Sequence, residues 1–239
     1  MASWAMHMEI GKRVCEKLNF DKDLFNYGNL IPDVDKGTSV SRHDAHFYGD
    51  MGFESCPREK MISINKFLGV YQNKLANHMI LGYYCHLITD NFFNNNVYSR
   101  FWVQDPMKNI IGVKLRNGKV ISVDEKDTKN IKKKYKHADF ELYGKYLFNE
   151  NEYYIPQDNG RILHSSGLLE PLFLDQKLID YRLNYLNQGF KKFNKLSLKE
   201  KMFKHKYEMY TKEELDSLMN ECATICINEL SRVMSFLSK

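Results

Sequence analysis

The sequence has little proline, no paired set of cysteines, and no uninterrupted apolar run long enough to cross a membrane. Only 5 of its 239 residues are Pro, and only 5 are Cys. An odd number of cysteines without a regular framework predicts reduced thiols, and therefore a cytoplasmic protein. Met1–Val14 contains charged residues within its apolar positions, so it is not expected to be a signal peptide. These features exclude a disulfide-rich scaffold and a membrane-spanning protein.

The composition is that of a globular protein with a substantial core. Hydrophobic residues make up 43% of the chain and aromatic residues 13%. The length suits one domain over residues 1–239. The formal net charge is only +5, and the lysines gather in two runs, Lys126–Lys136 and Lys191–Lys206. We expect these runs to form solvated helix faces; the alternative is a patch that attracts phosphate-bearing substrates.

Apolar residues at helical spacing predict a mainly α-helical bundle. A first helix is expected from Ser3 to about Leu18, and a second over Asp21–Tyr27, ended by Gly28. Pro32 then predicts extended backbone at Ile31 and a rigid corner that holds Asp33. A loop follows over residues 36–52, and a third helix is expected to open at Pro57.

The second half of the chain contains the clearest turn and capping signals. Asn117-Gly118 lies between two alternating segments and predicts one small β-hairpin, inserted at about residues 110–124. Helices are expected in residues 127–239. One begins at Asp127 or Thr128, one covers Asp175–Phe193, and the last starts at a capping box formed by Thr211 and Glu214. Residues 149–171 are expected to be irregular.

A long apolar run, Met79–Phe93, contains two polar residues that a helix would place on one face. The run predicts a buried central helix that ends at Asn94-Asn95-Asn96. His86 and Asp90 are four residues apart, so their side chains lie about 6 Å from each other along the helix axis. Burying them is costly unless a metal ion or a local hydrogen bond satisfies them. Gly82, one turn earlier, leaves room for a ligand or a crossing helix.

Other potential metal ligands precede this helix. Imidazole nitrogens and carboxylate oxygens bind zinc at about 2.0–2.2 Å, although other divalent ions accept the same donors. Each candidate histidine or aspartate could instead be an ordinary surface residue, turn residue or hydrogen-bonded core residue. His78 is expected to be a surface or capping residue, and Cys85, Cys222 and Cys226 are expected to be core residues. The candidates in the first 90 residues are His7, Asp33, His43, His46, His86 and Asp90.

The order of these residues resembles that of the zinc-dependent phospholipase C family, which shares its fold with the S1/P1 nucleases. The resemblance covers about residues 3–93, with the metal site within residues 1–100. It is carried by Trp4 and His7-x-x-Ile10, by Gly28-Asn29-Leu30-Ile31-Pro32-Asp33, by His46-Phe47, and by Gly82-Tyr83-Tyr84-Cys85-His86-Leu87-Ile88-Thr89-Asp90.

The resemblance implies a mainly helical fold, a zinc cluster and hydrolysis of phosphate esters. Carried onto matching positions, Asp33, His46, His86 and Asp90 would hold one zinc ion. Asp90 would bridge to a second ion that is also held by His7. Asp33, as a ligand or a nearby base, would orient the attacking water. Zinc ions at such sites lower the pKa of bound water and neutralise charge on phosphoryl oxygens.

The sequence also departs from the family pattern. In secreted members the amine of an N-terminal Trp is itself a ligand, whereas here Met1-Ala2-Ser3 precedes Trp4. The further His/His/acid set expected after the central helix is not visible at Asn94-Asn95-Asn96-Val97, and His164 with Glu170 is a weak substitute. A site for one or two zinc ions is therefore expected. His43 is either a replacement ligand or a loop residue.

Two alternative functions remain at this point. His43-Asp44 in a helical protein resembles the HD-domain nucleotide phosphohydrolases, in which Asp44 would be essential and His46 dispensable. The lost ligands also allow a non-catalytic protein that keeps the fold and a structural zinc. For the main hypothesis, the expected partner is a phospholipid head group or other phosphodiester. Transient membrane contact would be compatible with it, and no stable nucleic-acid complex is expected.

Overall fold

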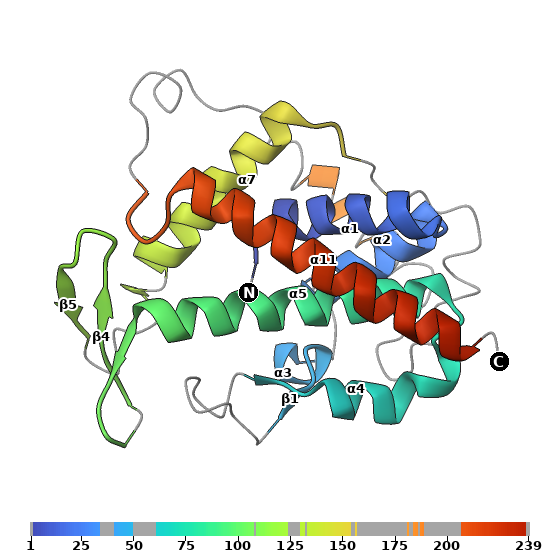
Figure 1. Ribbon diagram of the computed structural model, residues 1–239, viewed down its shortest axis with the longest axis horizontal. Coiled ribbons are helices and arrows are strands. Elements are labelled where there is room, and N and C mark those ends of the chain that lie inside the picture. The colour runs from blue at the N-terminus through green and yellow to red at the C-terminus, as the bar shows by residue number, and fades with distance from the viewer. Residues whose placement is uncertain are drawn as a thin grey trace.

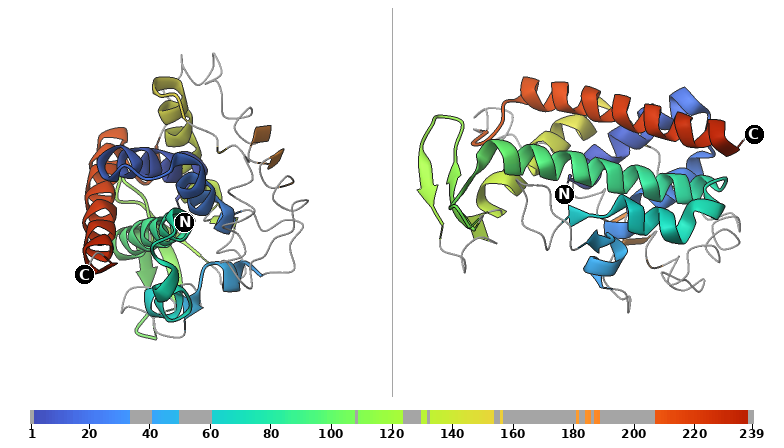
Figure 2. Two further views of the ribbon diagram at one scale, coloured as in Figure 1. Left: turned by 90° about the vertical axis from the view of Figure 1, so that its right-hand side faces the viewer. Right: turned by 60° about the horizontal axis from the view of Figure 1, so that its bottom comes forward.

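The computed structural model is mainly helical, with the long helix α5 (His78–Phe101) running through its centre (Figure 1). Viewed nearly along α5, the helix α11 lies on one side of it, α1 and α2 lie above it, and α4 lies below (Figure 2). The structure describes residues 2–33, 41–49, 61–107, 109–123, 130–131, 133–153, 156, 181, 184–185, 187–188 and 207–237.

Helix α1 spans Trp4–Leu18, close to the predicted bounds. Its apolar stripe is buried, with Met6, Ile10 and Val14 fully enclosed. Ser3 precedes the helix but its side chain makes no capping hydrogen bond, and Asn19 ends the helix with a left-handed backbone at φ 55°. The amphipathic pattern therefore predicted the position of α1 correctly.

Helix α2 spans Lys22–Leu30 and does not stop at Gly28, so the predicted end is wrong. Asp21 caps its start by accepting a hydrogen bond from the Leu24 N–H at 3.1 Å. Gly28 lies against the α5 backbone: a Cβ there would lie 1.9 Å from the Met79 carbonyl oxygen. Reciprocally, a Cβ at Gly82 would lie 2.0 Å from the Phe25 carbonyl oxygen. Because neither glycine has a Cβ, α2 and α5 can cross with their backbones in contact.

The chain continues from α2 into a 3-10 turn, η1 (Ile31–Asp33), instead of the predicted extended corner. Ile31 has φ −62° and ψ −30°, and its N–H donates to the Tyr27 carbonyl oxygen. The turn continues the helical hydrogen bonding for one more residue, and this outweighs the preference of a residue before proline for extended backbone. Asp33 is thereby directed back toward α5.

The segment after η1 contains regular structure where a loop was expected. Helix α3 covers Arg42–Ala45, and Ser41 caps it by accepting the Asp44 N–H at 3.1 Å. Strand β1 (Tyr48–Gly49) then pairs antiparallel with β2 (Met61–Ile62). Helix α4 begins at Ile64 rather than near Pro57, spans Ile64–Tyr71, is capped by Ser63, and leads into a 3-10 turn, η3 (Gln72–Lys74). Pro57 itself lies outside the described residues.

Helix α5 confirms the buried central helix but extends beyond the predicted end at residues 94–96. Two of the three asparagine side chains there accept tertiary hydrogen bonds. Asn94 Oδ1 accepts one from Lys136 Nζ at 3.1 Å, and Asn96 Oδ1 accepts one from the Tyr210 hydroxyl at 3.0 Å. Lys136, from the first lysine run, is therefore 93% buried rather than part of a solvated face.

The predicted hairpin is present as β4 (Ile110–Lys114) and β5 (Val120–Ser122), with Gly118 at φ 83° in its turn. A third strand, β3 (Trp102–Gln104), was not predicted and pairs antiparallel with β4. The resulting sheet has the order β3-β4-β5 and lies at the end of α5 where that helix finishes (Figure 1).

The C-terminal helices pack back onto α1 and α5. A π-helical turn, η5 (Lys133–His137), leads into α7 (Ala138–Glu150), and α11 spans Lys212–Leu237. The capping box is confirmed: the Thr211 N–H donates to Glu214 Oε2 at 2.8 Å, and the Glu214 N–H to Thr211 Oγ1 at 3.1 Å. The predicted start at 127 or 128 and most of the predicted helix 175–193 lie outside the described residues.

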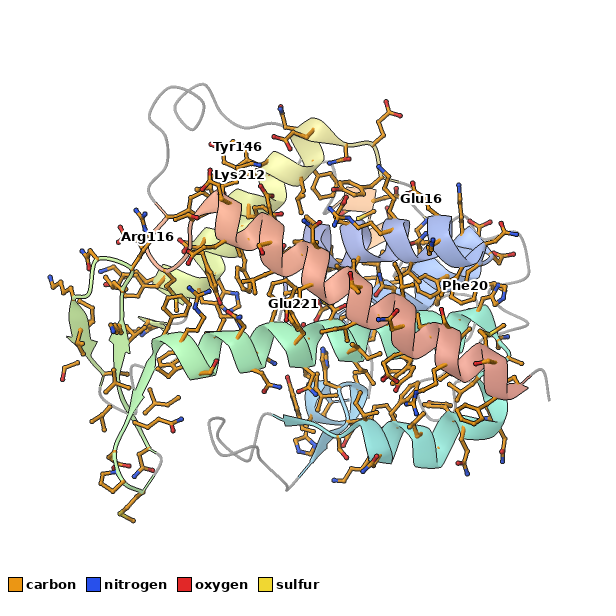
Figure 3. All side chains as sticks on the ribbon, viewed as in Figure 1. Glu16, Phe20, Arg116, Tyr146, Lys212 and Glu221 are labelled. Atoms are coloured by element: carbon orange, nitrogen blue, oxygen red, sulfur yellow. The ribbon has the colours of Figure 1, made fainter. Side chains whose placement is uncertain are left out.

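One hydrophobic core connects α1, α2, α5, α7 and α11. Glu221 lies on the outer face of α11 (Figure 3), whereas the next residue, Cys222, faces inward and is fully buried. Cys85 and Cys226 are also fully buried, so these three thiols are core residues as predicted. Within the described part of the chain, none of the helices is both long enough and apolar enough to cross a bilayer.

The close crossing of α2 and α5 makes Gly82 sensitive to a single added methyl group. We expect Gly82→Ala to lower the free energy of unfolding by at least about 2 kcal/mol, because the methyl would overlap the Phe25 carbonyl. Urea denaturation would measure the change. Gly69→Ala in α4 is the matched control, since a Cβ there meets no atom within 4 Å. Gly69→Ala should stabilise the protein, by no more than about 1 kcal/mol. Equal effects of the two substitutions would contradict the packing role.

His78 should make stability depend on pH. Its Nδ1 accepts the Asp21 N–H at 2.8 Å, and burial lowers its pKa below 6.5 against the opposite influence of the Asp21 charge. The unfolded chain therefore binds more protons than the folded one just below pH 6.5, and stability is lost as pH falls through that window. In His78→Gln the loss between pH 7.5 and 5.5 should be smaller. Identical pH profiles of the unfolding free energy would refute this role.

Candidate metal centre

His86 and Asp90 lie on the same face of α5, as their spacing predicts, and both side chains are completely buried. The His86 Nε2 is 3.7 Å from Asp90 Oδ2. That distance is too long for a direct hydrogen bond, so the two residues do not satisfy each other. The Asp90 Oδ2 has no hydrogen-bond partner among the described residues.

The orientation of the His86 ring is set by α2. Its Nδ1 is 2.8 Å from the Asn29 carbonyl oxygen, which can only accept a hydrogen bond, so Nδ1 carries the proton. Burial, followed by the neighbouring His7, lowers the pKa of His86 to about 3, and the ring is therefore neutral at pH 7. The Nε2 atom then presents a bare lone pair to the interior.

His46 enters the same space from α3. Its Nδ1 lies 3.0 Å from the Arg42 carbonyl oxygen, an arrangement that again directs Nε2 inward. This Nε2 is 3.3 Å from His86 Nε2, 3.3 Å from Asp33 Oδ1 and 3.6 Å from Asp90 Oδ2. The helix α3 is itself attached to α5, because the Tyr83 hydroxyl donates to the Ala45 carbonyl oxygen.

Asp33 completes the group from η1, with its side chain only 5% exposed. Burial alone would raise its pKa, but the neighbouring His46 imidazole and the nearby positive charge of Arg42 hold the pKa well below its usual range. The Arg42 guanidinium pairs directly with Asp33 Oδ1. Asp33 is therefore an ionised carboxylate in a buried site.

Together these four residues form a group that can hold a metal ion. One donor atom from each of Asp33, His46, His86 and Asp90 lies within 4.8 Å of the other three. Two inward-facing imidazole nitrogens beside two carboxylates repel one another unless a cation lies between them. Backbone carbonyls fix both rings through Nδ1, which is the usual outer support of metal-binding histidines. The chemistry of the donors therefore fits a divalent metal ion.

His7 adjoins this group without belonging to it. Its ring stacks on His86 with the centroids 4.0 Å apart, and its Nε2 lies 3.2 Å from Asp90 Oδ1. The Ala2 N–H donates to the same oxygen at 2.8 Å. Asp90 thus faces the four-residue group with Oδ2 and His7 with Oδ1, as a bridging carboxylate would. The second ion itself stays a prediction.

The other predicted candidates lie elsewhere. The side chains of His43 and Asp44 are 61% and 69% exposed, and neither joins the group. Gly82, expected to leave room for a ligand or a crossing helix, contacts α2. His164 and Glu170 lie outside the described residues. The sequence interpretation overlooked Arg42 and gave Asn29 no role. Arg42 could have been noticed because it lies one helical turn before His46.

Comparisons with family models, with curated proteins and with solved structures find no match to this chain. The centre is therefore defined by its own geometry, as a buried Asp/His/His/Asp group in a mainly helical protein.

The four-residue group should account for the metal content of the purified protein. His86→Ala and Asp90→Asn should each lower the bound divalent ion at least about 10-fold, because each removes one donor. Metal analysis by mass spectrometry after extensive dialysis would measure the loss, with circular dichroism to confirm folding. His43→Ala, which alters an exposed histidine, should retain wild-type metal content. Full occupancy in both buried variants would overturn the site.

Proposed function

We propose that the protein is a zinc-dependent hydrolase of phosphate esters, similar to the phospholipase C/D class, with one or two ions at this centre. The observation that carries the proposal is the buried group of two carboxylates and two inward-facing imidazole nitrogens. Two nitrogen and two oxygen donors suit zinc, although they do not exclude other divalent ions. The order of the same residues in the sequence supports the phospholipase C hypothesis.

In this proposal each residue has a defined task. Asp33, His46, His86 and Asp90 hold the first ion, and His7 with Asp90 Oδ1 holds a second where one binds. Bound zinc would lower the pKa of water and neutralise charge on the phosphoryl oxygens. Asp33 is the candidate catalytic residue because it is ionised, 5% exposed, and able to orient water at the edge of the group. Asn29 and the Arg42 carbonyl keep the two imidazoles in the binding tautomer.

The geometry favours this hypothesis over an HD-type phosphohydrolase. In the HD arrangement Asp44 would bind the metal and His46 would be dispensable. Here His46 is fully buried among the donors, whereas Asp44 is exposed and hydrogen-bonded to the Ser41 hydroxyl. The zinc-dependent hypothesis makes His46 essential, whereas the HD-type hypothesis makes Asp44 essential.

Phosphodiester hydrolysis by zinc-loaded protein tests the proposal. Suitable substrates are bis-p-nitrophenyl phosphate, short-chain phosphatidylcholine and an oligonucleotide. We expect turnover on at least one of them, and a loss of about 100-fold or more in kcat/KM for His46→Ala, which removes a metal donor. Asp44→Ala is the matched control and should keep wild-type activity.

Three outcomes would contradict parts of the proposal. Loss of activity in Asp44→Ala with retention in His46→Ala would favour the HD-type hypothesis. Tight zinc binding with no turnover on any of the three substrates would indicate a non-catalytic metal-binding protein. Turnover that survives removal of the ion by a chelator would exclude the metal-dependent mechanism.

A further inference from the structure

Arg42 is a partly exposed positive charge beside a buried group of donors. Its side chain is 33% exposed, whereas the Asp33 side chain is 5% exposed and those of His46, His86 and Asp90 are fully buried. A ligand that approaches from solvent on this side would meet the guanidinium next to Asp33.

The guanidinium is held in place before any ligand arrives. It pairs with Asp33 Oδ1, and the Tyr48 side chain lies close to it. The Tyr48 ring in turn stacks on His46 with the centroids 5.6 Å apart. Arg42 is also the first residue of α3, whose start is fixed by the Ser41 cap. Pre-organisation of this kind lowers the entropy cost of binding a ligand.

The charges of the site indicate which ligand fits. Asp33 and Asp90 together carry two negative charges, which one divalent ion neutralises, and the imidazoles add none when neutral. With one ion bound, Arg42 then leaves a single positive charge, and a second ion would add to it. A phosphodiester carries one negative charge, and two of its oxygens match the planar fork of a guanidinium. Neutral esters and amides lack this complementarity.

From this arrangement we infer that Arg42 binds the phosphoryl oxygens of a singly charged phosphodiester at the metal centre. The inference rests on the proposed function, which it deepens by naming the substrate class and a residue that recognises it. Arg42 contacts substrate in this assignment, while its pairing with Asp33 sets its direction.

The experiment compares zinc-loaded wild-type protein with Arg42→Gln, Arg42→Lys and Arg100→Gln. Arg100 is the matched control, because it also pairs with a carboxylate, Glu214 at 2.6 Å, and is 40% exposed. Calorimetric titration with dimethyl phosphate measures binding independently of turnover. We expect Arg42→Gln to weaken binding about 10- to 100-fold, as loss of a charged hydrogen bond predicts. Arg42→Lys should retain part of the affinity, and Arg100→Gln should match wild type.

The outcomes separate this inference from the proposed function. Unchanged affinity for dimethyl phosphate in Arg42→Gln, with zinc content intact, would overturn the inference alone. Loss of zinc from Arg42→Gln would also overturn it, because Arg42 would then act only by positioning Asp33. Arg42-dependent binding of dimethyl phosphate without hydrolysis of any substrate would support the inference and overturn the proposed hydrolase. A wild-type protein that takes up no zinc would overturn both.

Discussion

The contact between the backbones of α2 and α5 is the constraint on which the rest of the centre depends. Gly28 and Gly82 lie where each helix touches a carbonyl oxygen of the other, so no side chain separates them. This closeness brings the Asn29 carbonyl to His86 Nδ1 at 2.8 Å. It also places Asp33, at the end of the turn after α2, beside the face of α5 that carries Asp90. If α2 and α5 were further apart, the Asn29 carbonyl would no longer orient the His86 ring, and Asp33 would no longer lie beside Asp90.

The energetics of the centre follow from its burial. Asp90 stays ionised although burial would raise its pKa, because nearby positive charge lowers the pKa. His86 stays neutral because the same burial disfavours its cation. The site therefore places two anionic carboxylates beside the neutral His86 imidazole without a metal ion. A divalent cation meets Asp33, His86 and Asp90 in the protonation states that bind it.

Local signals in the sequence predicted the local structure well. The stripe of α1, the Asn117-Gly118 turn and the Thr211 capping box depend on neighbours a few residues away, and all three are present. The wrong end of α2 arose where a distant contact determines the structure. Gly28 was expected to end a helix. Instead it allows α2 to contact the backbone of Met79 on α5, and sequence spacing does not reveal this contact.

In the candidate site, too, the local features could be predicted from the sequence and the distant contacts could not. The shared face of His86 and Asp90 follows from helical geometry, whereas the grouping of Asp33 and His46 with them was expected only from the resemblance to a known family. The role of Asn29 was missed, because a carbonyl on α2 that accepts from an imidazole on α5 depends on how the two helices pack. Arg42 was overlooked although it lies one helical turn before His46. Residue types indicate which donors are available, and the helix crossings determine which of them meet.

Arg42 and His46 lie one helical turn apart, at the first residue of α3 and at the residue that follows its end. His46 is a donor of the four-residue group, and Arg42 lies beside Asp33 on the exposed side. On the proposed assignments, metal and anion therefore bind to the same few residues of backbone. Thermodynamic linkage then requires reciprocity: the factor by which the ion strengthens anion binding equals the factor by which the anion strengthens retention of the ion. Substrate would thus protect the protein from demetallation.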